Sequence, residues 1–301
     1  MLHIKSKKTL QLAYNRLTFL LQRTTMTIGW YPGHMNKARK DIIKLLQQVD
    51  LVIELVDARL PYSSENPLLN SLIGDIARLK VLNKIDLADP NTTNLWLEFY
   101  KQKSITCFAL DKTQPEKIKK LLKIAKSISG KKSDKVMRIM ILGIPNVGKS
   151  TLLNILLDKK IAKVGNEPAV TKASNEIILN DSIKLIDTPG VLWPKIEDQN
   201  SAYRLAITGA IKNTAIEFED IALFALDFLR DEYPENLKHR YQLSEIKLGA
   251  ALLLEAIGKQ RGCLGKGGVN FNKASEVLLH DIRNGALGKV SLEKPESIPQ
   301  I

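Results

Sequence analysis

The stretch VMRIMILGIPNVGKS, from Val136 to Ser150, decides the fold of this chain. Its first half is a short apolar run typical of a buried strand, and its second half has the spacing Gly-x-x-x-x-Gly-Lys-Ser. Glycines let backbone N–H groups converge on phosphate oxygens, and a helix beginning at Ser150 presents its positive end to them. The stretch therefore predicts a strand, a phosphate-binding loop and a helix ending near Leu157.

Each polar side chain of this loop has a separate predicted task. Lys149 would neutralise the β- and γ-phosphates of a nucleoside triphosphate, and the hydroxyl of Ser150 would bind Mg²⁺. The loop and the first turn of the helix supply the other predicted phosphate-binding residues, which are Asn146, Val147, Gly148 and Thr151.

A second motif, Asn83-Lys84-Ile85-Asp86, comes about sixty residues before the phosphate loop and follows a predicted strand over 78–82. The Asp86 carboxylate can accept hydrogen bonds from N1–H and the 2-amino group of guanine, and adenine lacks this pair of donors. The tetrapeptide therefore predicts a guanine-reading loop in which Asn83 and Lys84 also contact the nucleotide. We expect the chain to bind GTP and GDP rather than ATP.

A third motif, Asp187-Thr188-Pro189-Gly190, follows the apolar run 183–186. The Asp187 carboxylate can hold Mg²⁺ through water, and the Gly190 N–H can contact the γ-phosphate and release it after hydrolysis. Thr171 lies between the phosphate loop and Asp187. Its place in this order predicts a switch threonine that closes over Mg²⁺ and the γ-phosphate. The three motifs together predict hydrolysis of GTP to GDP and phosphate.

Strands and helices alternate over the first two thirds of the chain. Apolar runs at 51–56 and 104–109 predict two further strands, and helical patterns flank them at 38–48 and after Pro115. Asn180-Asp181 separates two short runs and predicts a hairpin. Such alternation favours an α/β fold, with a mostly parallel sheet and helices on both faces.

From Ser201 onward the chain shows four or five helical patterns, of which 243–257 is the clearest, and no convincing strand. This change predicts a second, all-α domain. The expected divisions are an N-terminal extension at 1–26, the nucleotide-binding domain at 27–198, the all-α domain at 199–294 and a tail at 295–301.

The net charge of +13 on 301 residues lies in one part of the chain. Residues 1–200 hold 32 Lys/Arg against 19 Asp/Glu, whereas residues 201–301 hold 13 of each. Residues 101–138 alone hold 12 basic and 3 acidic residues. This excess favours a polyanionic partner such as nucleic acid, and the alternative is a solvated lysine-rich helix.

The remaining composition narrows the class of protein. Cys107 and Cys263 cannot build a disulfide framework and have no zinc-ligand spacing, so we expect buried free thiols and no disulfide partner. No apolar run approaches the roughly 20 residues that span a bilayer. Residues 1–25 hold five Lys/Arg and no acid. That pattern fits either an organellar transit peptide or an upstream start before Met26.

The order guanine-reading loop, phosphate loop, switch threonine, Asp-Thr-Pro-Gly is rotated relative to ordinary GTPases. It resembles the circularly permuted GTPases and, more closely, the ribosome biogenesis GTPase A family with its mitochondrial relatives. The resemblance extends over roughly residues 29 to 294. Outside the nucleotide motifs it includes Trp30–Met35, Asp57–Arg59, Asn66-Pro67, Val191–Pro194, Gly267-Gly268, Asp281–Arg283 and Leu287-Gly288.

The resemblance implies a GTPase for late assembly of the large ribosomal subunit. Its partner would be the subunit precursor, with ribosomal RNA and ribosomal proteins, bound in the GTP state and left after hydrolysis. The location would be the bacterial cytoplasm, or the mitochondrial matrix if residues 1–25 are a transit peptide. Two alternatives remain from the residues themselves: a regulatory GTPase with a protein partner, and a metabolic P-loop kinase, against which the guanine-reading loop speaks.

The resemblance also implies roles for single residues. Val191 stands where small GTPases carry a water-orienting glutamine, and the family's proposed substitute is the histidine of Pro-Gly-His-Met, here His34. His34 would then join Lys149 and Thr171 as a catalytic residue. Asn146 matches GTPases that use K⁺ as a second cation. The backbone N–H of Ala109 would face guanine O6.

Overall fold

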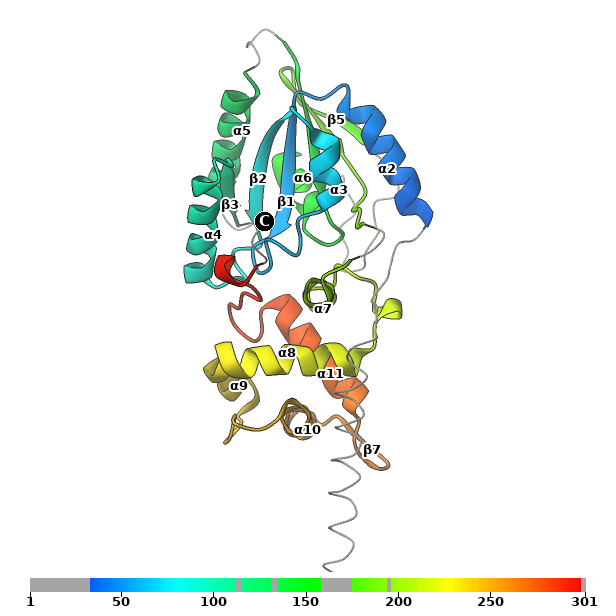
Figure 1. The fold of residues 1–301 in the computed structure, drawn as a ribbon, viewed down its shortest axis with the longest axis vertical. Coiled ribbons are helices and arrows are strands. Elements are labelled where there is room, and N and C mark those ends of the chain that lie inside the picture. The colour runs from blue at the N-terminus through cyan, green and yellow to red at the C-terminus, as the bar shows by residue number, and fades with distance from the viewer. Residues whose placement is uncertain (1–32, 112–114, 131–134, 158–174, 194–195, 299–301) are drawn as a thin grey trace, which may run out of the picture.

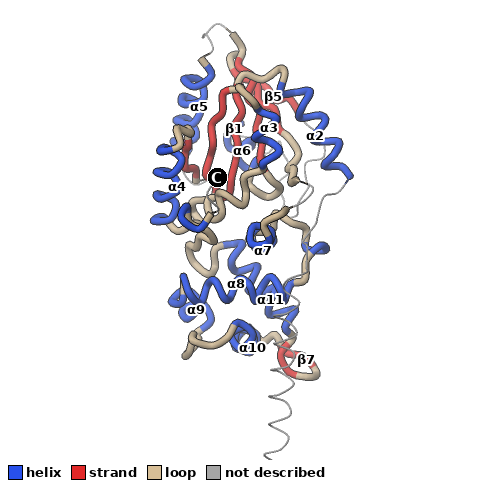
Figure 2. Tube along the Cα trace, viewed as in Figure 1, coloured by secondary structure: helices blue, strands red, loops and turns tan. Residues whose placement is uncertain are grey.

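The structure, a computed structural model, describes residues 33–111, 115–130, 135–157, 175–193 and 196–298. A six-stranded sheet with its helices forms one end of the molecule, and a group of helices forms the other (Figures 1 and 2). Residues 1–32, which include the predicted N-terminal extension, lie outside the described part.

The sheet has the strand order β3-β2-β1-β4-β6-β5. Five of its strands are parallel, and β5 pairs with β6 in the antiparallel direction at one edge. The strands are β1 (Leu51–Asp57), β2 (Ala77–Asn83), β3 (Cys107–Leu110), β4 (Met137–Gly143), β5 (Asn175–Asn180) and β6 (Ile183–Asp187). The predicted mostly parallel sheet and its hairpin are confirmed.

Five described helices accompany the sheet: α2 (Gly33–Leu46), α3 (Pro67–Ile73), α4 (Pro90–Gln102), α5 (Pro115–Ser129) and α6 (Lys149–Leu157). Local sequence fixes where they begin. Asp89 caps α4 by accepting from the N–H of Asn91, and Pro90 takes the first helical position. Figure 1 shows α3 in front of the sheet and α6 behind it, so both faces are covered as predicted. β1 is buried along its whole length.

The connections reverse direction between the neighbouring strands β1 and β4. From β1 the chain passes through α3 to β2 on one side, and from β4 it passes through α6 towards β6 on the other. In open α/β sheets, the crevice at such a reversal is where ligands bind. The predicted phosphate loop begins at this place, at the end of β4.

The helical end contains α7 (Gln199–Ile207), α8 (Phe218–Glu232), α9 (Pro234–Tyr241), α10 (Ala250–Gln260) and α11 (Phe271–Asn284). The predicted helix over 243–257 is wrong in its first half, because α10 begins only at Ala250. Gln242 closes α9 in a left-handed conformation with φ 52°, and Gly249 is extended before α10. The glycine-rich segment forms a small hairpin of β7 (Leu264–Gly265) and β8 (Gly268–Val269), which the sequence did not predict.

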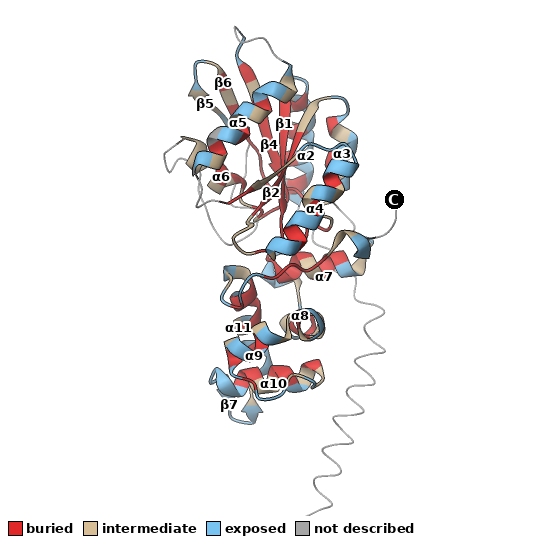
Figure 3. Cartoon of the chain, turned by 90° about the vertical axis from the view of Figure 1, so that its left-hand side faces the viewer, coloured by how far each residue is buried: buried red, intermediate tan, exposed pale blue. Residues whose placement is uncertain are grey.

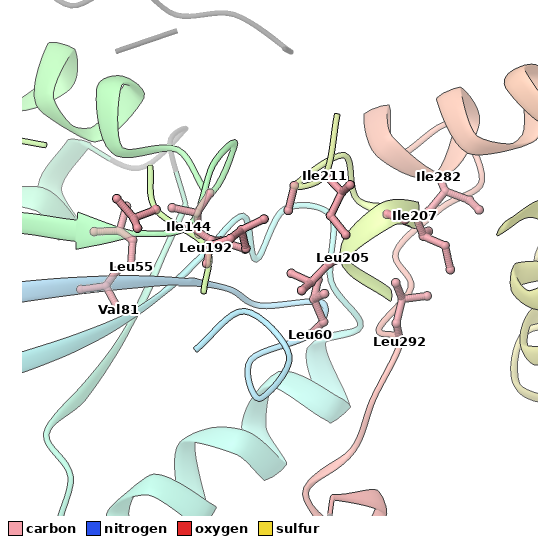
Figure 4. Packing of buried hydrophobic residues seen from close by; sticks show 14 of the residues in the cluster. Leu55, Leu60, Val81, Ile144, Leu192, Leu205, Ile207, Ile211, Ile282 and Leu292 are labelled. Atoms are coloured by element: carbon pink, nitrogen blue, oxygen red, sulfur yellow. The ribbon is translucent and has the colours of Figure 1, made fainter. Parts of the chain in front are cut away.

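One apolar cluster runs from the sheet into the helices. Leu60, Leu205, Ile282 and Leu292 are almost completely buried and belong to the same cluster as the strand residues (Figure 4). α7 lies between the sheet and α8 (Figures 1 and 3). Since one cluster includes residues on both sides of residue 198, the predicted domain division there stays a prediction.

The segment after α11, residues 286–298, returns to the sheet end and carries the short 3-10 helix η2 (Pro295–Ser297). Its backbone donates from Leu292 N to Arg59 O at 2.6 Å and from Val290 N to Leu87 O at 3.0 Å. The indole Nε1 of Trp96 on α4 donates to Glu293 O at 3.2 Å. This returning segment therefore holds the loops that follow β1 and β2.

None of the helices in the described part is long and apolar enough to cross a membrane. Both cysteines are free, with Cys263 buried and Cys107 half-buried. Burial raises the pKa of the Cys107 thiol to about 12.

Candidate functional site

The parallel strands bring the three motifs to one edge of the sheet. β2 ends at Asn83, β4 at Gly143 and β6 at Asp187, and the ladders β1·β2, β1·β4 and β4·β6 keep these ends in register. The guanine-reading loop, the phosphate loop and the Asp-Thr-Pro-Gly segment each follow directly. Motifs far apart in the chain therefore form a single site at the connection reversal.

The guanine-reading loop is bonded to the phosphate loop. The Asn83 side-chain Nδ2 donates to Val147 O at 2.8 Å. Gly148 has φ +104°, and a Cβ there would lie 2.3 Å from Asn83 Nδ2. Only glycine combines this backbone conformation with so close an approach. The relative position of the base site and the phosphate site is thus built into the protein.

Lys149 is buried at the centre of the phosphate loop. Its Nζ donates to Gly143 O at 3.0 Å and to Ile144 O at 2.8 Å. Burial lowers the pKa of Lys149 to about 8; Asp187 opposes this shift and Lys84 adds to it. An anionic phosphate in the loop would favour the charged amine and raise this pKa again.

Asp187 has the properties of a metal-binding carboxylate. It is 3% exposed, and its Oδ1 accepts no hydrogen bond from the described residues. Burial raises its pKa, while Lys149 and the Thr188 N–H lower it. Such a buried carboxylate oxygen fits a hard divalent cation such as Mg²⁺, which takes oxygen ligands. The described residues contain no cluster of three or more His, Cys, Asp or Glu side chains that could hold a metal.

The switch segment lies directly on the phosphate loop. Thr188 Oγ1 donates to Ile141 O of β4 at 2.7 Å. A Cβ at Gly190 would lie 2.6 Å from Pro145 Cα and 3.0 Å from Lys149 Nζ. The backbone of Gly190 therefore lies beside the Lys149 amine, as its predicted contact with the γ-phosphate requires. Val191 is 3% exposed within the apolar core, so an apolar side chain does stand where small GTPases orient water.

Sequence reasoning gave no role to Asp57 and Arg59, which lie beside the guanine-reading loop. Arg59 Nε and NH2 donate to the two carboxylate oxygens of Asp57 at 2.9 and 2.8 Å, and Lys84 Nζ donates to Asp57 Oδ2 at 2.9 Å. Burial alone would raise the Asp57 pKa, but the Arg59 and Lys84 charges hold it well below its usual range. Arg59 NH1 also donates to Ile282 O of α11 at 3.2 Å.

The phosphate loop has its own contact with the helical end. Asn146 has φ 57°, and its Nδ2 donates to Gly209 O, just after α7, at 2.7 Å. Arg283, at the end of α11, donates to Ile207 O and Ala206 O of α7 at 2.8 Å each. The phosphate loop is thus bonded to the segment just after α7 through Asn146. The guanine-reading loop is connected to α11 through Asp57 and Arg59.

The other predicted site residues occupy the following places. Ala109 lies in β3 opposite Leu82, and Ser150 and Thr151 lie in the first turn of α6. His34 belongs to the first turn of α2, although its side chain is outside the described part. Thr171 also lies outside the described residues, so the switch and catalytic roles of these two residues stay predictions.

The arrangement defines a class of protein. A phosphate loop at the connection reversal, a guanine-reading loop bonded to it and a switch segment packed on it form a GTP site. Since the guanine-reading loop comes first in the chain, the protein is a circularly permuted GTPase.

Comparisons with known proteins give the family. The profile of the 50S ribosome-binding GTPases matches residues 138–254. Ribosome biogenesis GTPase A of Priestia megaterium is 44% identical over 286 residues, covering 91% of this chain and 99% of that protein. The Bacillus cereus protein of the same name is 45% identical over 281 residues, covering 90% and 95%. GNP-bound YlqF from T. maritima is similar in structure, with TM-score 0.64 and 29% identity over 87% of this chain and 100% of that one. The chain belongs to the ribosome biogenesis GTPase A family and is a GTP-hydrolysing enzyme.

The guanine assignment predicts a change of base specificity for Asp86→Asn. The asparagine amide cannot accept from both guanine donors, so GTP affinity should fall about 100-fold or more. Its NH2 can donate to the 2-oxo group of xanthine, so XTP affinity should rise. Competition of GTP, XTP and ATP against a fluorescent nucleotide measures both effects. The exposed Asp75→Asn is the control. Unchanged GTP preference in Asp86→Asn would contradict the assignment.

Proposed function

We propose that this GTPase is an assembly factor for late maturation of the large ribosomal subunit. It binds precursor particles, with their RNA and proteins, in the GTP state and leaves them after hydrolysis. The names of its relatives and the 50S ribosome-binding description of the matching family support ribosomal particles as the partner. The proposal places the protein in the bacterial cytoplasm, as its bacterial relatives suggest.

The observation that carries the GTP-gated part is the pair of hydrogen bonds between the nucleotide loops and the helices. Asn146 of the phosphate loop bonds Gly209 O after α7, and Arg59 beside the guanine-reading loop bonds Ile282 O of α11. A nucleotide that contacts these loops differently in its di- and triphosphate forms would stabilise different positions of α7 and α11. A particle that contacts the helices would then distinguish the two forms.

The proposal includes the cofactors. Mg²⁺ would be held by Ser150 and Asp187, with Thr171 closing over it in the GTP state, and it would neutralise charge on the phosphates. An amide can donate with its nitrogen and bind a cation with its oxygen, so the Asn146 bond to Gly209 is compatible with K⁺ at the phosphate loop. His34 would position the attacking water in place of the missing glutamine.

The proposal is tested by co-sedimentation with precursors of the large subunit in a GTP analogue, in GDP and without nucleotide. We expect co-sedimentation with the GTP analogue and loss of it with GDP. Equal sedimentation in all three conditions would contradict GTP gating. Absence of sedimentation in every condition would contradict the ribosomal partner and favour a regulatory GTPase that acts on another protein.

A further inference from the structure

α5 carries three lysines on its outer side. Lys120, Lys123 and Lys126 are all exposed, whereas Leu121 and Ala125 of the same helix are completely buried against the sheet. We call these three residues the lysine row. At 1.5 Å per residue it extends over about 9 Å along the helix axis. Figure 3 shows α5 on the surface of the sheet end, with exposed residues along its outer side.

The lysine row lacks the ion pairs that three lysines of other helices form. Lys101, Lys238 and Lys259 each have a glutamate three or four residues earlier on the same helix, with N–O distances of 3.5, 4.0 and 2.7 Å. Within the described residues, no carboxylate forms an ion pair with any member of the lysine row, although Glu116, the only acid of α5, lies four residues before Lys120. Three exposed lysines of α2 are likewise unpaired within that part of the chain: Lys37, Lys40 and Lys44.

Unpaired lysines at this spacing weaken the helix. Like charges three or four residues apart destabilise a helix by roughly 0.2–0.5 kcal/mol per pair, and the row contains two such pairs. The lysines of α4 and α10 instead each pair with a glutamate three or four residues earlier. An external anion bound along the row would remove the repulsion between its lysines.

The chemistry of the row favours nucleic acid over protein as that anion. Protein interfaces are depleted in lysine and have an apolar centre. None of the large exposed apolar side chains of the described residues lies on α5. Phosphates of one nucleic-acid strand follow each other at about 3.4 Å along the axis, so a row of about 9 Å faces two to three of them. We propose that the lysine row binds the phosphate backbone of RNA on the ribosomal particle. This inference rests on the function proposed above.

The test compares two triple variants of the full-length protein. Lys120, Lys123 and Lys126 are changed to Gln in one, and the exposed Lys212, Lys247 and Lys289 are changed to Gln in the other. Both lose the same charge. Binding to precursor particles is measured with the GTP analogue between 50 and 200 mM salt, and GTP hydrolysis without particles confirms that the site is intact.

Loss of three phosphate contacts should reduce the slope of log affinity against log salt by about 2 to 3. The wild type should then lose about 20- to 40-fold more affinity than the lysine-row variant over this salt range. The control variant should keep the wild-type slope. Wild-type binding with an unchanged slope in the lysine-row variant would overturn this inference alone. Absence of wild-type binding would instead overturn the proposed function.

A photocrosslinker at position 123 identifies the class of partner directly. We expect labelled RNA from the particle. Label that appears only on a ribosomal protein would overturn the RNA assignment, whatever the salt slope.

Discussion

Lys149→Ala should lower the affinity for GTP and GDP about 100- to 1,000-fold, which corresponds to about 3–4 kcal/mol. Lys149 Nζ is buried, and among the described residues its hydrogen-bond partners are two backbone carbonyl oxygens, Gly143 O and Ile144 O. A phosphate would give this amine a full charge partner in a site of low dielectric constant, where such bonds are strong. Titration calorimetry with GDP measures the loss.

The control for this prediction is Lys184→Ala on β6, where the half-buried lysine pairs with Glu176 near the surface. It removes the same kind of side chain outside the three nucleotide motifs and should leave nucleotide affinity unchanged. Thermal unfolding without nucleotide shows whether each variant is folded. A folded Lys149→Ala protein with wild-type GDP affinity would contradict the phosphate-loop assignment.

The pKa of Lys149 gives a second measurement on the same residue. It is about 8 in the free protein and should be higher when a phosphate is bound, so binding takes up a proton above pH 8. Wild-type affinity should therefore fall as the pH rises from 7 to 9. Calorimetry at pH 8 in buffers of different ionisation enthalpy detects the proton uptake directly. The proton uptake should disappear in Lys149→Ala.

The sequence was sufficient to predict the sheet and the meeting of the motifs. Each motif directly follows an apolar run, and parallel strands place all such ends at one edge. Residues such as Asn83, Lys149 and Asp187 could be proposed for the site because their side chains carry the chemistry. Backbone pattern and side-chain type were the only information that this part of the prediction required.

Other features had no local signal. Arg59 donates to the backbone carbonyl of Ile282, which lies 223 residues later. Because every residue has a backbone carbonyl, nothing in the sequence marks Ile282 as the partner. The return of residues 286–298 to the sheet depends on backbone hydrogen bonds such as Val290 N to Leu87 O. It could not be predicted for the same reason. The start of α10 was misplaced because the apolar spacing from Leu243 looks helical, while the left-handed Gln242 and extended Gly249 interrupt it.

Arg59→Met should destabilise the protein by about 3–5 kcal/mol, the usual effect of removing one partner from a buried ion pair. Asp57 and Arg59 are 2% and 1% exposed, and the variant would leave the Asp57 carboxylate with Lys84 as its remaining charged partner, besides the backbone N–H of residue 59. Denaturant unfolding without nucleotide measures the change. The control is Arg138→Met, since Arg138 pairs with Glu176 at the surface and should contribute no more than about 1 kcal/mol.

The double variant Asp57→Asn with Arg59→Met separates the buried charge from the lost packing. Removing both charges together should recover part of the stability, because an uncompensated carboxylate no longer remains in the interior. If the double variant is as unstable as the sum of the single variants, the ion pair is not the source of the effect.

The same residue should also transmit the nucleotide state. Arg59 is the group that joins Asp57, and through it Lys84 of the guanine-reading loop, to the α11 carbonyl of Ile282. Hydrogen exchange of the last turn of α11 should therefore differ between GDP and a GTP analogue in the wild type. In Arg59→Met the difference should shrink, while the control Arg138→Met keeps it. A difference of wild-type size in a folded Arg59→Met protein would leave Arg59 with a purely structural role and would place the coupling at the Asn146–Gly209 contact.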